Sequence, residues 1–231
     1  MTSLLGVPID AVYHLVFVLN NVLTPVLGSL AAVAGIILIT VAVRLLVLPL
    51  SFRAMRGQAI QARLAPQLQD LRKRYGKQPE RLQREMTALY KQEGTSMFAG
   101  LSPLLLQMPF LSVMYLMFRS SRIAGAPNKL LTHDLLGVPL GMHWLSGAGI
   151  VSMQGAVFVG VFVLLAVLCW LLARVARSMA PTSAGSGMLT RVLPYTTVVI
   201  AAFAPLAAGV YLLTSTGWAV LERRLYRRTR Q

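Results

Sequence analysis

Long apolar runs separated by short charged stretches dominate the pattern of this chain. From residue 28 to residue 43 only Ser29 and Thr40 are polar, and neither carries a charge. About 20 apolar residues are needed for an α-helix to cross a bilayer. By this criterion, and after the last run is divided as described next, the candidate spans are residues 28–50, 98–118, 150–172, 188–204 and 205–221.

The last apolar run is divided because it is too long for one crossing. Residues 192–221 would extend about 45 Å as a helix, against a hydrocarbon core of about 30 Å. The stretch "FAPLAAG" contains Pro205 and Gly209, which favour a break. Two passes of about 17 residues are short and imply a locally thinned bilayer. The predicted fold class is therefore an all-α polytopic membrane protein with five transmembrane helices.

Two further helical elements lie outside these spans. Residues 8–27 are apolar on one side and predict an amphipathic helix in the outer interface. The alternative, a cleaved signal peptide, lacks the positive residues expected at its start. Residues 57–93 carry two apolar stripes at helical spacing, with Gly76 and Pro79 between them. They predict a helical hairpin with a charged outer face, and a solvated connecting loop is the alternative.

Composition supports a membrane protein and limits how the net positive charge can be interpreted. The chain is 56% hydrophobic and 13% charged, with a mean hydropathy of +0.65, yet its net charge is +15. Nucleic-acid binding would place basic residues on a soluble face. Here the basic residues stand between apolar runs, so membrane topology explains them better.

The placement of Lys and Arg predicts the orientation. Residues 1–43 contain none, residues 53–91 contain ten, and residues 222–231 contain five arginines. Cytoplasmic loops collect such charges. We therefore expect the N-terminus and the loop 119–149 outside, and the hairpin and the basic tail 222–231 inside.

No motif for catalysis or metal binding is present in the sequence. It has no Walker loop, dinucleotide fingerprint, HExxH or CxxC pair. Cys169 lies within a span and is typical of a small hydrophobic residue. The histidines His14, His133 and His143 lack metal-ligand spacing. We expect no enzyme activity, no cofactor and no metal.

Arg44 is the exceptional residue, because it interrupts the first apolar run in "VAVRLLVLPL". An arginine at membrane depth costs about 2.5–3.5 kcal/mol on insertion scales. Its side chain either snorkels past Leu50 to the interface or lines a polar recess. Polar residues in the later spans could share such a recess, although small polar residues also join helices. The candidates are Gln107, Tyr211, Thr214 and Ser215.

Several stretches together resemble the YidC/Oxa/Alb membrane protein insertases. "VRLLVLPLSFRAMRGQAIQARLAPQLQDLRKRYG" followed by "GLSPLLLQMPFLSVMYLMFR" is similar to the family's first core span, cytoplasmic hairpin and Pro-Gln-Pro span. "HDLLGVPL" and "PLAAGVYLLTSTGW" are similar to its later landmarks. The sequence shows neither a large extracytoplasmic domain nor a lipoprotein cysteine, so it looks like the compact, actinobacterial type of Gram-positive YidC.

The resemblance implies an insertase of the bacterial cell membrane. Arg44 would face a hydrophilic groove that is open to the cytoplasm and to lipid and closed outside. Tyr211 matches an aromatic position that the family places near substrate, whereas Gln107, Thr214 and Ser215 are assigned to the groove only by proximity. Substrates would be nascent membrane proteins, inserted independently of the Sec translocase or beside it.

The basic tail has two interpretations. Its arginines could anchor the chain to anionic lipids. The family's basic tails imply contact with the ribosome instead, through Arg223, Arg224, Arg227, Arg228 and Arg230. Alternative functions for the whole chain are a channel or transporter subunit that uses Arg44 for an anion, or an assembly factor that inserts nothing itself.

Overall fold

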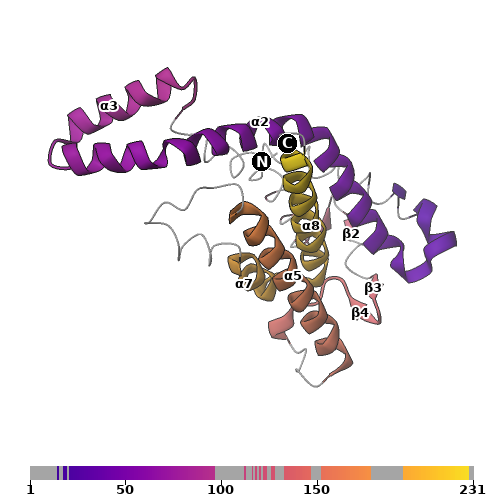
Figure 1. Ribbon diagram of the computed structural model, residues 1–231. Helices are drawn as coiled ribbons and strands as arrows, with labels where there is room; N and C mark the ends of the chain where they lie inside the picture. The colour runs from indigo at the N-terminus through magenta and orange to yellow at the C-terminus, as the bar shows by residue number, and fades with distance from the viewer. Residues whose placement is uncertain are drawn as a thin grey trace.

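The computed structural model describes most, but not all, of the chain. Its helices and strands are η1 (Gly28–Leu30), α2 (Ala31–Tyr75), α3 (Pro79–Gln92), β1 (Arg122–Ile123), β2 (Ala126–Pro127), β3 (Asp134–Leu135), β4 (Val138–Pro139), η4 (Trp144–Ser146), α5 (Met153–Arg177), α7 (Thr196–Phe203) and α8 (Leu206–Arg228). The described residues are 15, 18–19, 21–96, 112, 116, 118, 120, 122–123, 126–127, 133–146, 152–177 and 195–228. The protein is mostly helical, as the sequence predicts (Figure 1).

Three predicted elements fall wholly or partly outside the described residues. Nearly all of the expected span 98–118 lies there, including Gln107. So does half of the expected interfacial helix 8–27, of which residues 15, 18–19 and 21–27 are described and helical. Of the expected span 188–204, the structure describes residues 195–204.

Helix α2 is the longest element and joins two predicted ones. It continues for 45 residues through Pro49 and Pro66, so the expected span 28–50 and the first half of the hairpin are one helix. A proline inside a helix removes one backbone hydrogen bond and favours bending. Figure 1 shows α2 changing direction part-way, after which it runs alongside α3.

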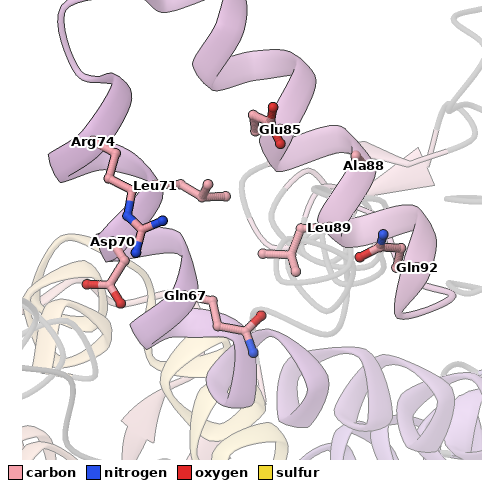
Figure 2. A pocket seen from close by; sticks show the side chains of 8 residues that line it. All are labelled: Gln67, Asp70, Leu71, Arg74, Glu85, Ala88, Leu89 and Gln92. Carbon is pink, nitrogen blue, oxygen red and sulfur yellow. The ribbon is translucent and has the colours of Figure 1, made fainter.

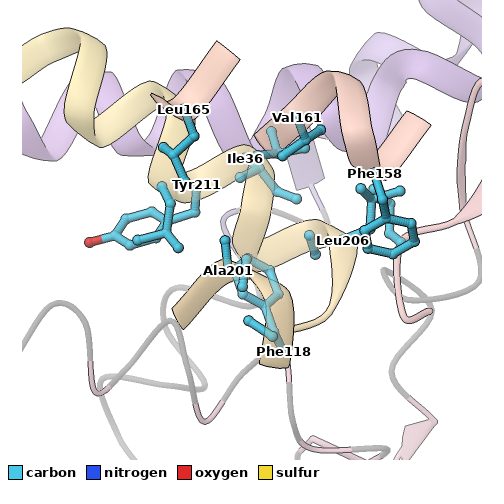
Figure 3. Packing of buried hydrophobic residues seen from close by; sticks show 14 of the residues in the cluster. Ile36, Phe118, Phe158, Val161, Leu165, Ala201, Leu206 and Tyr211 are labelled. Carbon is cyan, nitrogen blue, oxygen red and sulfur yellow. The ribbon is translucent and has the colours of Figure 1, made fainter. Parts of the chain in front are cut away.

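Among the described residues, two helices are apolar and long enough to cross a membrane. They are the helix at Asn21–Tyr75, which contains α2, and the segment Met153–Val175 of α5. Helix α8 packs against both α2 and α5. The apolar cluster between them includes Ile36 of α2, Phe158 of α5 and Leu206 of α8, each at most 1% exposed (Figure 3).

The break expected near Pro205 is present. Helix α7 ends at Phe203, Ala204 is extended with ψ 157°, and α8 begins at Leu206. Close packing follows this break, because a Cβ on Gly209 would lie 3.2 Å from Cγ1 of Val161 on α5. Glycine at this position therefore lets α8 approach α5 closely.

A short β-hairpin caps the start of α8. Strands β3 and β4 pair antiparallel around Leu136 and Gly137, whose φ values of 52° and 80° are those of a type I′ turn. The carbonyls of Met142 and Leu140 accept hydrogen bonds of 2.9 Å from the backbone N–H groups of Leu206 and Ala207. First-turn N–H groups have no partner inside their own helix. The loop thus provides hydrogen-bond partners for the first N–H groups of α8, at the end that lies away from the α2–α3 hairpin (Figure 1).

Candidate functional site

Arg44 contacts the last long helix rather than pointing along its own. Its Nη2 donates a hydrogen bond to the hydroxyl of Ser215 and a longer one, 3.4 Å, to the Ser215 carbonyl. Ser215 lies on α8 and is 2% exposed, whereas Arg44 is half-buried. Hydrogen bonds to a charged group are stronger than neutral ones. They partly offset the cost of placing the guanidinium inside an apolar bundle.

Tyr211 completes this group of side chains, one helical turn before Ser215. It is 2% exposed, it makes a side-chain hydrogen bond with Ser215, and it interacts electrostatically with Arg44. Its ring lies at the edge of the apolar cluster, with the hydroxyl pointing away from that cluster (Figure 3). We call Arg44, Tyr211 and Ser215 the polar site.

Thr214 was also a candidate for this site. Its hydroxyl donates a 2.9 Å hydrogen bond to the carbonyl of Val210, one turn earlier in its own helix. Adjacent helical residues lie about 100° apart around the axis. Thr214 therefore lies on a different face of α8 from Ser215.

The register between α2 and α8 shows how the two helices are oriented. Arg44 pairs with Ser215, and Ser51 hydrogen-bonds Glu222, so a step of seven residues on α2 matches seven on α8. Phe52 and Tyr226 continue the contact, with ring centroids 5.9 Å apart. The two helices consequently run parallel. We call these residues, together with Tyr211, the α2–α8 seam.

Glu222 is a residue of the seam that sequence reasoning missed. Its side chain is 6% exposed, and Nε1 of Trp218 donates a 2.5 Å hydrogen bond to its Oε1. It also interacts electrostatically with Arg44 and Arg223. The signal was present, because Glu222 stands seven residues after Ser215 and is the only acidic residue in the tail.

The α2–α3 hairpin forms a second, more exposed feature. A pocket of about 300 Å³ lies between the two helices, with Leu71 and Leu89 pointing toward each other across it (Figure 2). Arg63 and Glu93 form an ion pair at the base of the hairpin, where Gln61 also donates a hydrogen bond to the carbonyl of Ser96. The remaining residues that line the pocket are Gln67, Asp70, Arg74, Glu85, Ala88 and Gln92.

Comparison with known proteins identifies the family. Residues 22–231 match the model of the 60Kd inner membrane protein family. The chain belongs to this family. It is the YidC/Oxa family that the sequence resembles, and its bacterial members are inner membrane proteins.

Individual members of the family match over shorter stretches. A membrane protein insertase YidC of Clostridium tetani is 33% identical over 114 residues, which are 49% of this chain and 52% of that protein. One from Clostridium perfringens is 40% identical over 86 residues, 37% and 36% of the two chains. One from Helicobacter pylori is 33% identical over 121 residues, 52% and 22%. The chain thus spans about half or less of the length of these relatives.

In this member of the 60Kd inner membrane protein family, the polar site combines one charged group with hydroxyl groups. Within the part of the chain that the structure describes, no group of three His, Cys, Asp or Glu could hold a metal ion. The polar site offers instead one guanidinium and two hydroxyl groups, which suit carboxylates and backbone carbonyls. Nothing in this set is a nucleophile activated by a base.

Proposed function

We propose that the protein is a membrane protein insertase that receives a polar segment of a nascent membrane protein at the polar site. Family membership and relatives named membrane protein insertase support this function. The observation that carries the role of the site is the hydrogen bonding of Arg44 to Ser215 between two apolar helices. A side chain that snorkelled to the interface would have no need of this buried partner.

The proposed mechanism lowers the cost of moving polar groups through hydrocarbon. An unpaired polar group costs several kcal/mol in an apolar medium. A hydrated recess around Arg44, open to the cytoplasm and to lipid, would replace part of that medium with water and hydrogen-bond donors. Burial of the new apolar span, with the membrane potential acting on acidic segments, then supplies the driving force. No nucleotide hydrolysis is required.

The parallel seam supports the proposed topology. Helices α2 and α8 cross in the same direction if both span the membrane, so their C-terminal ends emerge on one side. The basic hairpin includes the C-terminal part of α2, and most of the basic tail forms the C-terminal end of α8. We place both in the cytoplasm, with the N-terminus outside, five spans in all, and the cap formed by residues 133–146 on the outer side.

The cytoplasmic elements would recruit partners. The hairpin has exposed charged faces and would dock incoming chains or the targeting machinery near anionic lipid. Arg224 and Arg228 are exposed at the end of α8 and would contact lipid phosphates or ribosomal RNA. Action alone or beside the Sec translocase is compatible with this arrangement.

Reconstitution tests the proposal. Purified protein in liposomes that lack Sec components should insert a short single-span substrate, with its polar tail protected from added protease. A photoreactive residue at position 44 should crosslink to that substrate during insertion, whereas one at the lipid-exposed Leu46 of α2 should crosslink less. Anion flux without insertion would indicate a channel, and neither activity would indicate an assembly factor.

A further inference from the structure

Glu222 is a buried acid whose position calls for a role. A carboxylate that is 6% exposed at the α2–α8 seam has lost most of its hydration. Taking an ionised group out of water is costly unless hydrogen bonds and opposite charges compensate. A glutamine of the same shape would fill the position without that cost.

The carboxylate is held in place from both helices. Trp218 donates from one turn earlier on α8, at 2.5 Å, and Ser51 contributes a hydrogen bond from α2. Arg223, the next residue, adds a nearby positive charge. These contacts fix the side chain, so its charge keeps a constant position relative to the polar site.

That position is two helical turns from the polar site. Ser51 follows Arg44 by seven residues, and Glu222 follows Ser215 by seven, which is about 10 Å along either helix. The guanidinium of Arg44 and the carboxylate of Glu222 interact electrostatically. In a protein interior, where the effective dielectric constant is well below that of water, a charge still acts over about 10 Å.

We propose that Glu222 is a specificity-determining residue whose fixed negative charge offsets that of Arg44 and so limits the preference of the polar site for acidic substrate segments. This inference rests on the proposed function. An acidic segment at Arg44 is attracted by the guanidinium and repelled by Glu222. A neutral segment feels neither force strongly. The pair therefore broadens the range of segments that the site accepts.

The test compares substrates that differ only in charge. Three single-span substrates carry two acidic, two neutral or two basic residues in the translocated tail. Each is inserted into liposomes containing equal amounts of folded wild-type protein or Glu222→Gln. The variant should raise the acidic-to-neutral insertion ratio roughly threefold to fivefold and lower the basic-to-neutral ratio.

Glu222→Asp is the matched control, because it alters the length of the side chain and keeps the negative charge. Its effect should be equal for all three substrates. Equal scaling of all three by Glu222→Gln would overturn the inference and leave the carboxylate a purely structural role. Failure of both Glu222→Gln and Glu222→Ala to accumulate in membranes would overturn it as well.

The design separates this inference from the proposed function. If the wild-type protein inserts none of the three substrates, the insertase function fails. If the wild-type protein inserts them and the ratios do not respond to Glu222→Gln, only the role of Glu222 fails.

Discussion

The α2–α8 seam and the α2–α3 hairpin share one helix but use charge in opposite ways. In the seam, Arg44 and Glu222 are held by hydrogen bonds among buried neighbours. On the hairpin, nearly all charged side chains are exposed, and the ion pair of Arg63 with Glu93 lies at the surface. Exposed pairs contribute little, whereas desolvated charges interact strongly. One charge in the seam should therefore matter more than one on the hairpin.

Removing the hairpin altogether should have the largest effect. Deletion of residues 60–90 is expected to abolish insertion and to leave a stable protein in the membrane, because the apolar cluster around Ile36 and Leu206 lies elsewhere. Protease protection of the remaining loops and liposome insertion measure the two properties. A control that replaces residues 60–90 with an unrelated helical hairpin should keep the fold and remain inactive. Loss of the protein from the membrane would assign the hairpin to the folded core.

Arg44 should show the next largest effect. Arg44→Ala should reduce insertion of substrates with acidic tails about tenfold, because the positive charge and the hydrogen bond to Ser215 are both lost. Arg44→Lys should retain more activity, since charge outweighs bidentate geometry in a hydrated site. Arg84→Ala on the exposed face of α3 is the control and should be silent. Wild-type insertion rates for both Arg44 variants would refute the role of the polar site.

The basic tail should have a smaller effect that depends on salt. Truncation after Leu221 would also remove Glu222 and Tyr226, which are buried, so substitution is the cleaner experiment. Arg224, Arg228 and Arg230 changed to Gln should weaken ribosome co-sedimentation at low salt and leave topology unchanged, because phosphate contacts release counterions. Co-sedimentation equal to that of wild type would leave only lipid anchoring for these arginines.

The surface ion pair should have the smallest effect. Arg63→Gln removes the partner of Glu93 and should destabilise the hairpin by about 0.2–1 kcal/mol. Limited proteolysis of the hairpin, compared with that of Arg84→Gln, measures the change. A loss of insertion by Arg63→Gln as large as that by Arg44→Ala would contradict the contrast between the two regions.

The sequence predicted the residues of the polar site better than their arrangement. Arg44, Tyr211 and Ser215 stand out because they are polar within apolar runs, and the structure brings them together. Thr214 is also polar within an apolar run, but it points to a different face of α8. The orientation of α8 about its axis decides which of these residues face Arg44. Gln107 lies outside the described residues. Glu222 was overlooked because its neighbours are arginines, and burial is a property of the packed helices.

The helix boundaries show a similar limit. Pro205 predicted a real break, because the chain turns there and Ala204 is extended. The first expected span ended at residue 50, yet α2 continues through Pro49 to Tyr75. A helix tolerates an internal proline when its other backbone hydrogen bonds are made. A proline alone therefore does not decide where a helix ends. The parallel register of the seam depends on contacts far apart in the sequence.

The continuity of α2 makes it a mechanical lever. From Arg44 to Tyr75 the helix extends about 46 Å, with the hairpin pocket at one end and the guanidinium near the other. Pro49 and Pro66 both lie between these two ends, and each removes a backbone hydrogen bond and makes the helix easier to bend there. A ligand that pushes on the hairpin would therefore apply torque at these two positions. If the hairpin docks a partner, as we propose, a tilt of α2 would also change the contact of Arg44 with Ser215.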